Sequence, residues 1–295
     1  MVKLHGVNVA MCTAFTHDDQ RFDPGRYREH IDMLIEAGVH GIVLNSGTGE
    51  FAYMSDDEVI EITRVGAEHI AGRVPVVAQT STVSLALCIE KSKAAVDAGA
   101  DALMVLPPWL EGPFAAGVMH HYLALADAVD STLVLYNIPQ VSGVEVTAEM
   151  WSELSAHPNI GHIKDSTGDV AKMQALVAAG PGVLGGCDPI APFALLAGAE
   201  GWIWGAANVM PAESVAVYEL LRGNRVSEAM ELWRTKMFPF NSFIWDNPHA
   251  AEYITAVKTA ASVRFGDLGP SRLPQLPLGA DALAALRTTL EPLDL

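Results

Sequence analysis

The sequence predicts an α/β protein, a (β/α)8 TIM barrel with extra helices at its C-terminal end. One phrase recurs three times, as EAGVHGIVL, DAGADALMVL and LAGAEGWIW. Each copy is an amphipathic segment that ends in Ala-Gly and then enters an apolar run. Glycine tolerates the left-handed conformation that stops a helix, and the apolar run suits a buried strand. Eight such runs, alternating with helical patterns along the chain, predict a closed parallel sheet.

The elements can be assigned in order along the chain. The helix after the second strand opens with a capping box from Ser55 to Glu58, and the helix after the third strand closes at Gly99. Beyond Pro211 the pattern is helical to about Arg264, and a loop rich in proline and glycine then leads to a last short helix. The predicted strands cover residues 7–15, 42–44, 74–79, 102–106, 132–137, 160–164, 183–186 and 202–204.

These assignments divide the chain into a barrel, residues 1–223, and a C-terminal helical extension packed on the barrel, residues 224–295. A doubly wound open sheet is the competing fold, but it requires a glycine-rich phosphate loop after its first strand. The segment TAFTHDDQRFDPG at that place is not such a loop.

Composition excludes several classes of partner. The formal net charge is −17 and no basic run occurs, which argues against binding to nucleic acid or to an anionic membrane. Three cysteines without a CxxC motif predict a reduced, cytoplasmic chain. The most apolar region, IAPFALLAGAEGWIWGAANVM, is interrupted by Pro192, Glu200 and Asn208, so it predicts a buried helix–strand unit rather than a membrane span.

The predicted strand ends place reactive side chains on one rim, because βα loops carry the chemistry of such barrels. Lys164 ends the sixth strand, Tyr136 lies near the end of the fifth, and the loop NSGTGE follows the second. Taken alone, a strand-end lysine is most often a solvated cap, and the loop could be an ordinary turn. Together they suggest a 2-oxo acid whose carboxylate is held by loop amides and whose ketone is bonded to Lys164 as a Schiff base. Tyr136 could then transfer the proton.

Metal sites are not expected. His120 and His121 are adjacent, so a helix points them in different directions, and no HxH or HExxH motif occurs. We therefore expect no metal and no cofactor beyond the covalent Schiff base.

The motifs SGTGE, YNIP, IKDSTGD and NP…VK together resemble those of the dihydrodipicolinate synthase / N-acetylneuraminate lyase family of class I aldolases. The resemblance runs from about Gly6 to beyond Arg272. It implies a barrel, a homotetramer built as a dimer of dimers, and pyruvate bound as a Schiff base. It further implies the roles of individual residues: Lys164 as nucleophile, Tyr136 and Thr48 in proton transfer, the amides of Gly47 and Thr48 on the carboxylate, and backbone groups of Gly186 and Ile203 lining the pyruvate pocket.

The residues expected to bind the aldehyde differ from those of both enzymes after which the family is named. Val141 stands where dihydrodipicolinate synthases place an arginine, and Trp109 stands where they contribute a tyrosine across the subunit interface. Pro189 replaces an acidic residue of the neuraminate lyases, and Gly47 replaces the first hydroxyl of the loop. PPWL is similar to the tryptophan motif of hydratase-aldolases. A neutral aldehyde is therefore expected on this side.

Several functions fit this reading. The leading one is an enzyme, a lyase that cleaves or forms a C–C bond between pyruvate and an aldehyde. A 2-keto-3-deoxy sugar acid dehydratase, a hydratase-aldolase or a 2-oxo acid decarboxylase could use the same lysine. The alternative outside the enzymes is a barrel that binds a 2-oxo acid without catalysing a reaction.

His162 lies two residues before Lys164, so both side chains point to the same face of the strand. One interpretation is a neutral histidine satisfied by a hydrogen bond in the core. The other is a modulator whose charge disfavours the ammonium of Lys164 and changes the acid limb of the pH profile.

Overall fold

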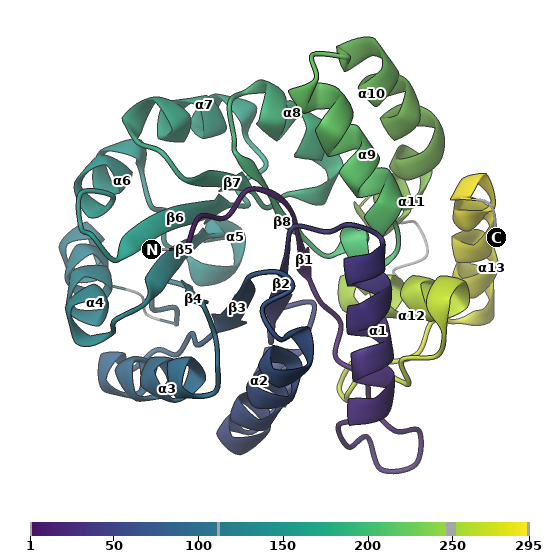
Figure 1. The fold of residues 1–295 in the computed structure, drawn as a ribbon, viewed down its shortest axis with the longest axis horizontal. Coiled ribbons are helices and arrows are strands. Elements are labelled where there is room, and N and C mark those ends of the chain that lie inside the picture. The colour runs from purple at the N-terminus through teal and green to yellow at the C-terminus, as the bar shows by residue number, and fades with distance from the viewer. Residues whose placement is uncertain (1, 111–112, 246–251, 294–295) are drawn as a thin grey trace.

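Eight parallel strands close into a barrel in sequence order, as predicted. The computed structural model describes residues 2–110, 113–245 and 252–293. Figure 1 shows the strands at the centre and the helices around them. The strands are β1 (Gly6–Ala10), β2 (Gly41–Leu44), β3 (Val76–Gln79), β4 (Ala102–Val105), β5 (Thr132–Asn137), β6 (Ile160–Asp165), β7 (Val183–Gly185) and β8 (Gly201–Trp204).

The helices that follow the strands form the outer layer. The predicted capping box is present, since Ser55 accepts from the amide of Glu58 while the Glu58 carboxylate accepts from the amide of Ser55. The three Ala-Gly turns also form as predicted, with left-handed glycines at Gly38, Gly99 and Gly198. The outer helices are α1 (Pro24–Glu36), α2 (Asp56–Ile70), α3 (Leu85–Asp97), α4 (Ala115–Ala128), α6 (Ala148–Leu154), α7 (Val170–Ala179), α8 (Ala191–Leu196) and α9 (Pro211–Arg222).

The prediction for the first strand was too long. Residues 7–15 were expected, but β1 ends at Ala10. The amide of Met11 still donates to the carbonyl of Val43 in β2, but those of Cys12 and Phe15 donate to groups outside the sheet: Cys12 to Asn208 Oδ1 at 3.0 Å and Phe15 to the carbonyl of Leu268 at 2.9 Å. The apolar run is therefore longer than the strand, since loop residues rather than a neighbouring strand accept the backbone hydrogen bonds of its second part.

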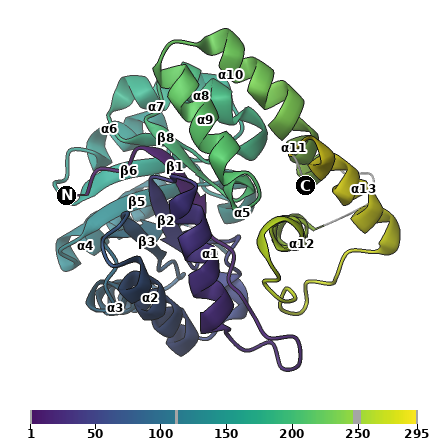
Figure 2. The same ribbon diagram turned by 45° about the vertical axis from the view of Figure 1, so that its right-hand side comes forward.

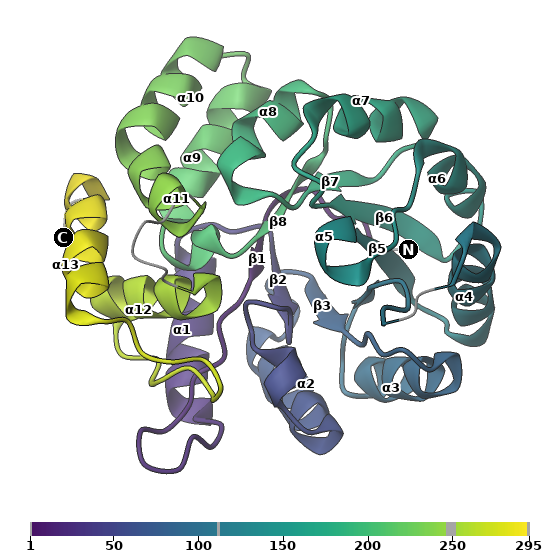
Figure 3. The same ribbon diagram turned by 180° about the vertical axis from the view of Figure 1, so that it is seen from behind.

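Alternation along the strands separates an interior core from the helix-facing core. Figure 1 shows the N-terminal segment crossing one end of the barrel, and Figure 3 shows the opposite end, where the short helix α5 (Pro139–Ser142) follows β5. Tyr136 is the next-to-last residue of β5 and packs against the interior core, so it lies at the carboxyl mouth of the barrel. The interior core comprises Leu4, Ala10, Val43, Val77, Ala102, Met104, Val134, Leu184 and Ile203.

The remaining helices are α10 (Val226–Leu232), α11 (Phe238–Trp245), α12 (Tyr253–Phe265) and α13 (Ala280–Leu290), with a π-helix, Trp233–Met237, between α10 and α11. Figure 2 shows α12 and α13 at one side of the barrel. Trp233 stacks on Trp204 of β8, with ring centres 6.1 Å apart. We propose, on the basis of such contacts, that residues 224–295 form an extension packed on the barrel of residues 1–223.

Candidate active site

A cavity of about 420 Å³ opens at the carboxyl mouth of the barrel. It lies between the loops that follow several strands and the start of α12, as expected for a barrel of this kind. Most of the predicted site residues line it: Gly47, Thr48, Tyr136, Val141, Lys164 and Gly186.

Lys164 and Tyr136 are direct partners in the pairing of β6 with β5. Lys164 is 5% exposed, and its Nζ lies 3.9 Å from the centre of the Tyr136 ring. Gly186 makes this packing possible, because a Cβ at that position would come within 2.7 Å of Cε and Cγ of Lys164. The two neighbouring strands thus hold an amine against an aromatic ring at the mouth of the barrel.

A second buried lysine shows by contrast what is unusual about Lys164. Lys258 Nζ donates to Glu50 Oε1 and to the carbonyl of Pro270, both at 2.8 Å. No described carboxylate or carbonyl accepts a hydrogen bond from Lys164. An amine that attacks a carbonyl needs a free lone pair, and an ammonium held in an ion pair has none. Of these two buried lysines, Lys164 is therefore the one suited to be a nucleophile.

The loop after β2 is held in a fixed shape by its neighbours. Asn45 and Glu50, at its two ends, have left-handed backbones, with φ values of 54° and 67°. Asn45 Nδ2 donates to the carbonyl of Val59 at 3.0 Å, and Glu50 receives Lys258. A Cβ on Gly49 would lie 2.8 Å from a backbone oxygen, whereas one on Gly47 would meet no atom within 4 Å. Gly49 is thus required for packing, and Gly47 faces open space in the cavity.

A buried acid, Asp188, lines the cavity next to this loop. The hydroxyl of Tyr253 donates to Asp188 Oδ2 at 2.8 Å, and the amide of Ala206 donates to the same oxygen at 3.2 Å. Burial raises the pKa of Asp188 to about 6, although the bond from Tyr253 and the charge of Lys164 oppose this. A Cβ on Gly205 would come within 2.3 Å of Tyr253 Oη and 2.8 Å of Thr48 Oγ1, so these two hydroxyls lie on one side of the cavity.

Three of the predicted substrate-binding residues do not line the cavity. Ile203 belongs to the interior core below the mouth. Pro189 lies in a single 3-10 turn, Asp188–Ile190, in which Asp188 lines the cavity instead. Trp109 borders a separate surface cavity of about 300 Å³ together with His120. That Trp109 acts at a subunit interface stays a prediction.

His162 is buried within the barrel, toward the end opposite the mouth. Its Nε2 accepts from the amide of Leu4 at 3.1 Å, and its Nδ1 lies 3.3 Å from the carbonyl of Gly182. Nε2 also lies 3.2 Å from the carbonyl of Val2. With the amide of Leu4 donating to Nε2, a neutral ring carries its proton on Nδ1, which faces the carbonyl of Gly182. Burial lowers the pKa of His162 below its ordinary value, against smaller raising effects of Val2, Glu200 and Gly182. From this burial we propose that His162 is a neutral packing residue rather than a modulator.

We expect His162→Asn to leave the acid limb of the pH–rate profile unchanged but to alter the pH dependence of stability. The folded state resists protonation at His162, so the unfolded chain takes up the proton first. The residue therefore contributes stability above about pH 6.5 that is lost as the pH falls toward the lower pKa of the folded state. Thermal denaturation should show a smaller acid-induced fall in Tm for the variant than for the wild type. A displaced acid limb in the rate profile would instead support the modulator.

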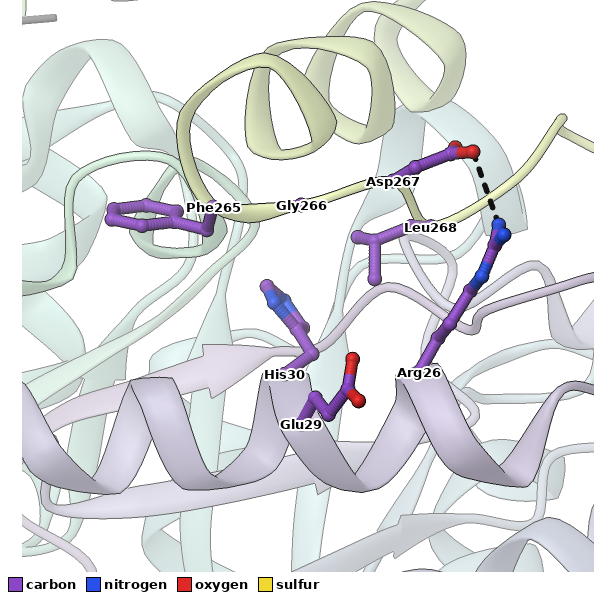
Figure 4. Close-up of a pocket in the computed structure, with 7 residues that line it drawn as sticks. All are labelled: Arg26, Glu29, His30, Phe265, Gly266, Asp267 and Leu268. Atoms are coloured by element: carbon purple, nitrogen blue, oxygen red, sulfur yellow. Dashed lines mark hydrogen bonds and ion pairs between the residues drawn. The ribbon is translucent and has the colours of Figure 1, made fainter.

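The described residues also line cavities away from the mouth of the barrel. A smaller cavity of about 210 Å³ lies between α1 and the segment after α12, where Arg26 pairs with Asp267 at 3.1 Å (Figure 4). None of the predicted site residues lines it. Within the described ranges, no group of three or more His, Cys, Asp or Glu side chains could hold a metal ion. None of the helices described is long and apolar enough to cross a bilayer.

Known proteins resemble this chain along nearly its whole length. A profile described as the Dihydrodipicolinate synthetase family matches residues 3–293. The 4-hydroxy-tetrahydrodipicolinate synthase of Stenotrophomonas maltophilia is 35% identical over 283 residues, which cover 95% of this chain and 93% of that protein. The structure of dihydrodipicolinate synthase from Bacillus anthracis matches with a TM-score of 0.93 at 27% identity, covering 99% of each chain. That of YagE, a prophage protein from E. coli K12 in complex with pyruvate, matches with a TM-score of 0.90 at 28% identity, again covering 99% of each chain.

The fold and the relatives define a class I aldolase-type lyase, and the chain is an enzyme of that class. It belongs to the dihydrodipicolinate synthetase family. Members of this family use a Schiff base between a lysine and pyruvate and no metal cofactor. The alternative of a barrel without catalytic activity is therefore set aside.

Proposed function

We propose that this enzyme joins pyruvate to Lys164 as a Schiff base and makes or breaks a C–C bond between pyruvate and a neutral aldehyde. The observation that carries the proposal is the placement of Lys164: buried at the mouth, against Tyr136, with no carboxylate partner among the described residues. In this proposal the amides of Gly47 and Thr48 hold the carboxylate of pyruvate.

The proposed chemistry starts from the amine of Lys164, which lies against the ring of Tyr136. The amine adds to the ketone carbon of pyruvate, and loss of water leaves an imine. Loss of a methyl proton then gives an enamine, which attacks the aldehyde carbon to form the new C–C bond. Tyr136, with Thr48 in its relay, accepts and returns the protons. Hydrolysis of the imine releases a 4-hydroxy-2-oxo acid, and the same steps in reverse cleave it.

The walls of the cavity support a neutral aldehyde. Among the described residues that line it, Lys164 is the only cation, and Val141 is exposed at its rim. Asp188 is an acid beside the reacting centre. A second carboxylate on the substrate would lose its hydration without gaining a cationic partner, and it would face Asp188.

We therefore expect aspartate semialdehyde, which is ionised, to be at least about 100-fold poorer in kcat/KM than the best neutral aldehyde. Steady-state assays across acidic, polyhydroxylated and apolar aldehydes, with pyruvate fixed, measure this. Efficient turnover of aspartate semialdehyde would overturn the substrate assignment and would place the chain with its curated relatives.

Asp188 favours dehydration as the second candidate function. A dehydratase has to protonate a departing hydroxide. Burial raises the pKa of Asp188 to about 6, and in its protonated form Asp188 would donate to Tyr253 Oη while the hydroxyl of Tyr253, which otherwise donates to the carboxylate, passes its own proton to the departing group. Release of water from a 2-keto-3-deoxy sugar acid, without any aldehyde product, would identify this reaction.

We also propose that the enzyme is a cytoplasmic homotetramer. Leu110 and Phe114, close to Trp109, are 79% and 94% exposed, and apolar surface of this kind suits a subunit interface. Cys12, Cys88 and Cys187 are unpaired, in agreement with a reducing compartment.

A further inference from the structure

Gln79 is a buried polar residue of the cavity that the proposed chemistry does not use. It is the last residue of β3 and shares the interior face with Val77, two positions earlier. It pairs in register with Met104 of β4, is 1% exposed and lines the same cavity as Lys164. In a closed ring of eight strands, β3 is three strands away from β6, so Gln79 belongs to the wall across the barrel from Lys164.

The amide of Gln79 has no hydrogen-bond partner within the described part of the chain, at either Nε2 or Oε1. Its neighbours in sequence are satisfied. The hydroxyl of Thr80 lies 2.8 Å from that of Ser92, and Ser81 Oγ accepts from the amide of Leu106 at 2.9 Å. Burying an amide without partners costs free energy of folding, and a ligand that supplies them recovers part of that cost.

The pyruvate adduct is a poor match for this amide. Its carboxylate only accepts hydrogen bonds and is proposed to lie on the loop of Gly47 and Thr48, while its ketone carbon is bonded to Lys164. Gln79 offers a donor and an acceptor side by side, so its complement is a group that both accepts and donates. A hydroxyl is the simplest such group. The apolar walls at Leu106 and Ile138 then suit the remainder of the molecule.

We propose that Gln79 binds a hydroxyl group on the aldehyde substrate and thereby selects an aldehyde with an apolar body and one hydroxyl. This inference rests on the proposed function and refines it from a neutral aldehyde to a monohydroxylated one. Gln79 acts as a specificity residue of the aldehyde half-site and takes no part in bonding pyruvate to Lys164.

The test compares pairs of aldehydes that differ by one hydroxyl, such as butanal with its monohydroxy analogues and benzaldehyde with the hydroxybenzaldehydes. In the wild type, kcat/KM should favour at least one hydroxylated member by about tenfold or more. Gln79→Met keeps the length of the side chain and removes the amide. The ratio should therefore fall to about one, because kcat/KM for the hydroxylated aldehyde decreases.

Gln140→Met is the matched control, since Gln140 lines the same cavity but already donates to the carbonyls of Ser166 and Thr167. It should keep the wild-type ratio.

Two further readouts separate the possible failures. Trapping of the pyruvate adduct by borohydride should be the same in Gln79→Met and in the wild type. A normal adduct with an unchanged aldehyde ratio would overturn the role of Gln79 alone, whereas no adduct in the wild type would overturn the proposed function as well. The Tm of Gln79→Met should equal or exceed that of the wild type. A lower Tm, confirmed with Gln79→Leu, would show that the amide is already partnered in the free enzyme and would also contradict the inference.

Discussion

Lys164→Ala is expected to lower turnover by at least about 10³-fold, because the variant cannot form the covalent adduct through which every proposed step passes. Stability should change little in comparison, since Lys164 makes no ion pair with a described residue. Steady-state kinetics together with thermal denaturation measure the two effects separately. Activity within tenfold of the wild type in a folded variant would remove Lys164 from the mechanism.

Tyr136→Phe provides the companion measurement. Phenylalanine keeps the ring that lies 3.9 Å from Lys164 Nζ but removes the hydroxyl. The variant should still bind pyruvate covalently, while turnover falls by about 10²- to 10⁴-fold, the usual range for loss of a general acid–base group. Loss of the adduct along with turnover would indicate that Tyr136 serves Schiff-base formation itself.

The largest effect on stability is expected from Lys258→Met. Lys258 and Glu50 form an ion pair in which both side chains are at most 2% exposed. Removing the lysine leaves the carboxylate buried and uncompensated, so the free energy of unfolding should fall by about 3–5 kcal/mol. Denaturant unfolding at neutral pH measures this loss. Glu50 also accepts from the amide of Arg272 at 2.7 Å. We therefore expect the loop after β2, which ends at Glu50, and the C-terminal segment around Arg272 to be destabilised together.

Lys172→Met is the matched control for that experiment. Lys172 pairs with Glu145 at 2.8 Å, but its side chain is 45% exposed. An exposed pair contributes at most about 1 kcal/mol, so this variant should remain close to the wild type. The double variant Glu50→Gln with Lys258→Met should recover part of the lost stability. Equal stability of Lys258→Met and Lys172→Met would contradict a structural role for the buried pair.

Much of the fold was predictable because it rests on local patterns. Ala-Gly turns and apolar runs recur along the chain, and a capping box marks the start of one helix. Each of these patterns can be recognised within about ten residues of sequence. Lys164 and Tyr136 were predictable as neighbours for the same reason, because consecutive strands of a barrel pair and their ends share one rim. The end of the first strand was missed because an apolar run does not reveal whether its backbone partners come from a sheet or from a loop.

The missed residues of the site depend on distant parts of the chain. Tyr253 and Asp188 are hydrogen-bonded although they lie 65 positions apart in the sequence, so no local sequence pattern predicts their contact. Gln79 could have been found, since it follows Val77 by two positions and ends a predicted strand. Its significance lies in the missing hydrogen-bond partners, however, and these can be recognised only when the surrounding side chains are in place. Pro189 was predicted from the resemblance to the neuraminate lyases, whereas in the short turn Asp188–Ile190 it is Asp188 that lines the cavity.

The Schiff base on Lys164 is tested most directly by borohydride reduction of the enzyme in the presence of pyruvate, followed by intact-mass measurement and peptide mapping. We expect one reduced pyruvate per chain, located on Lys164 and absent from Lys164→Ala. The buried Lys258 should remain unlabelled because it is held by Glu50. A label on Lys258 or Lys236, or no label at all, would contradict the assignment of Lys164 as the Schiff-base lysine.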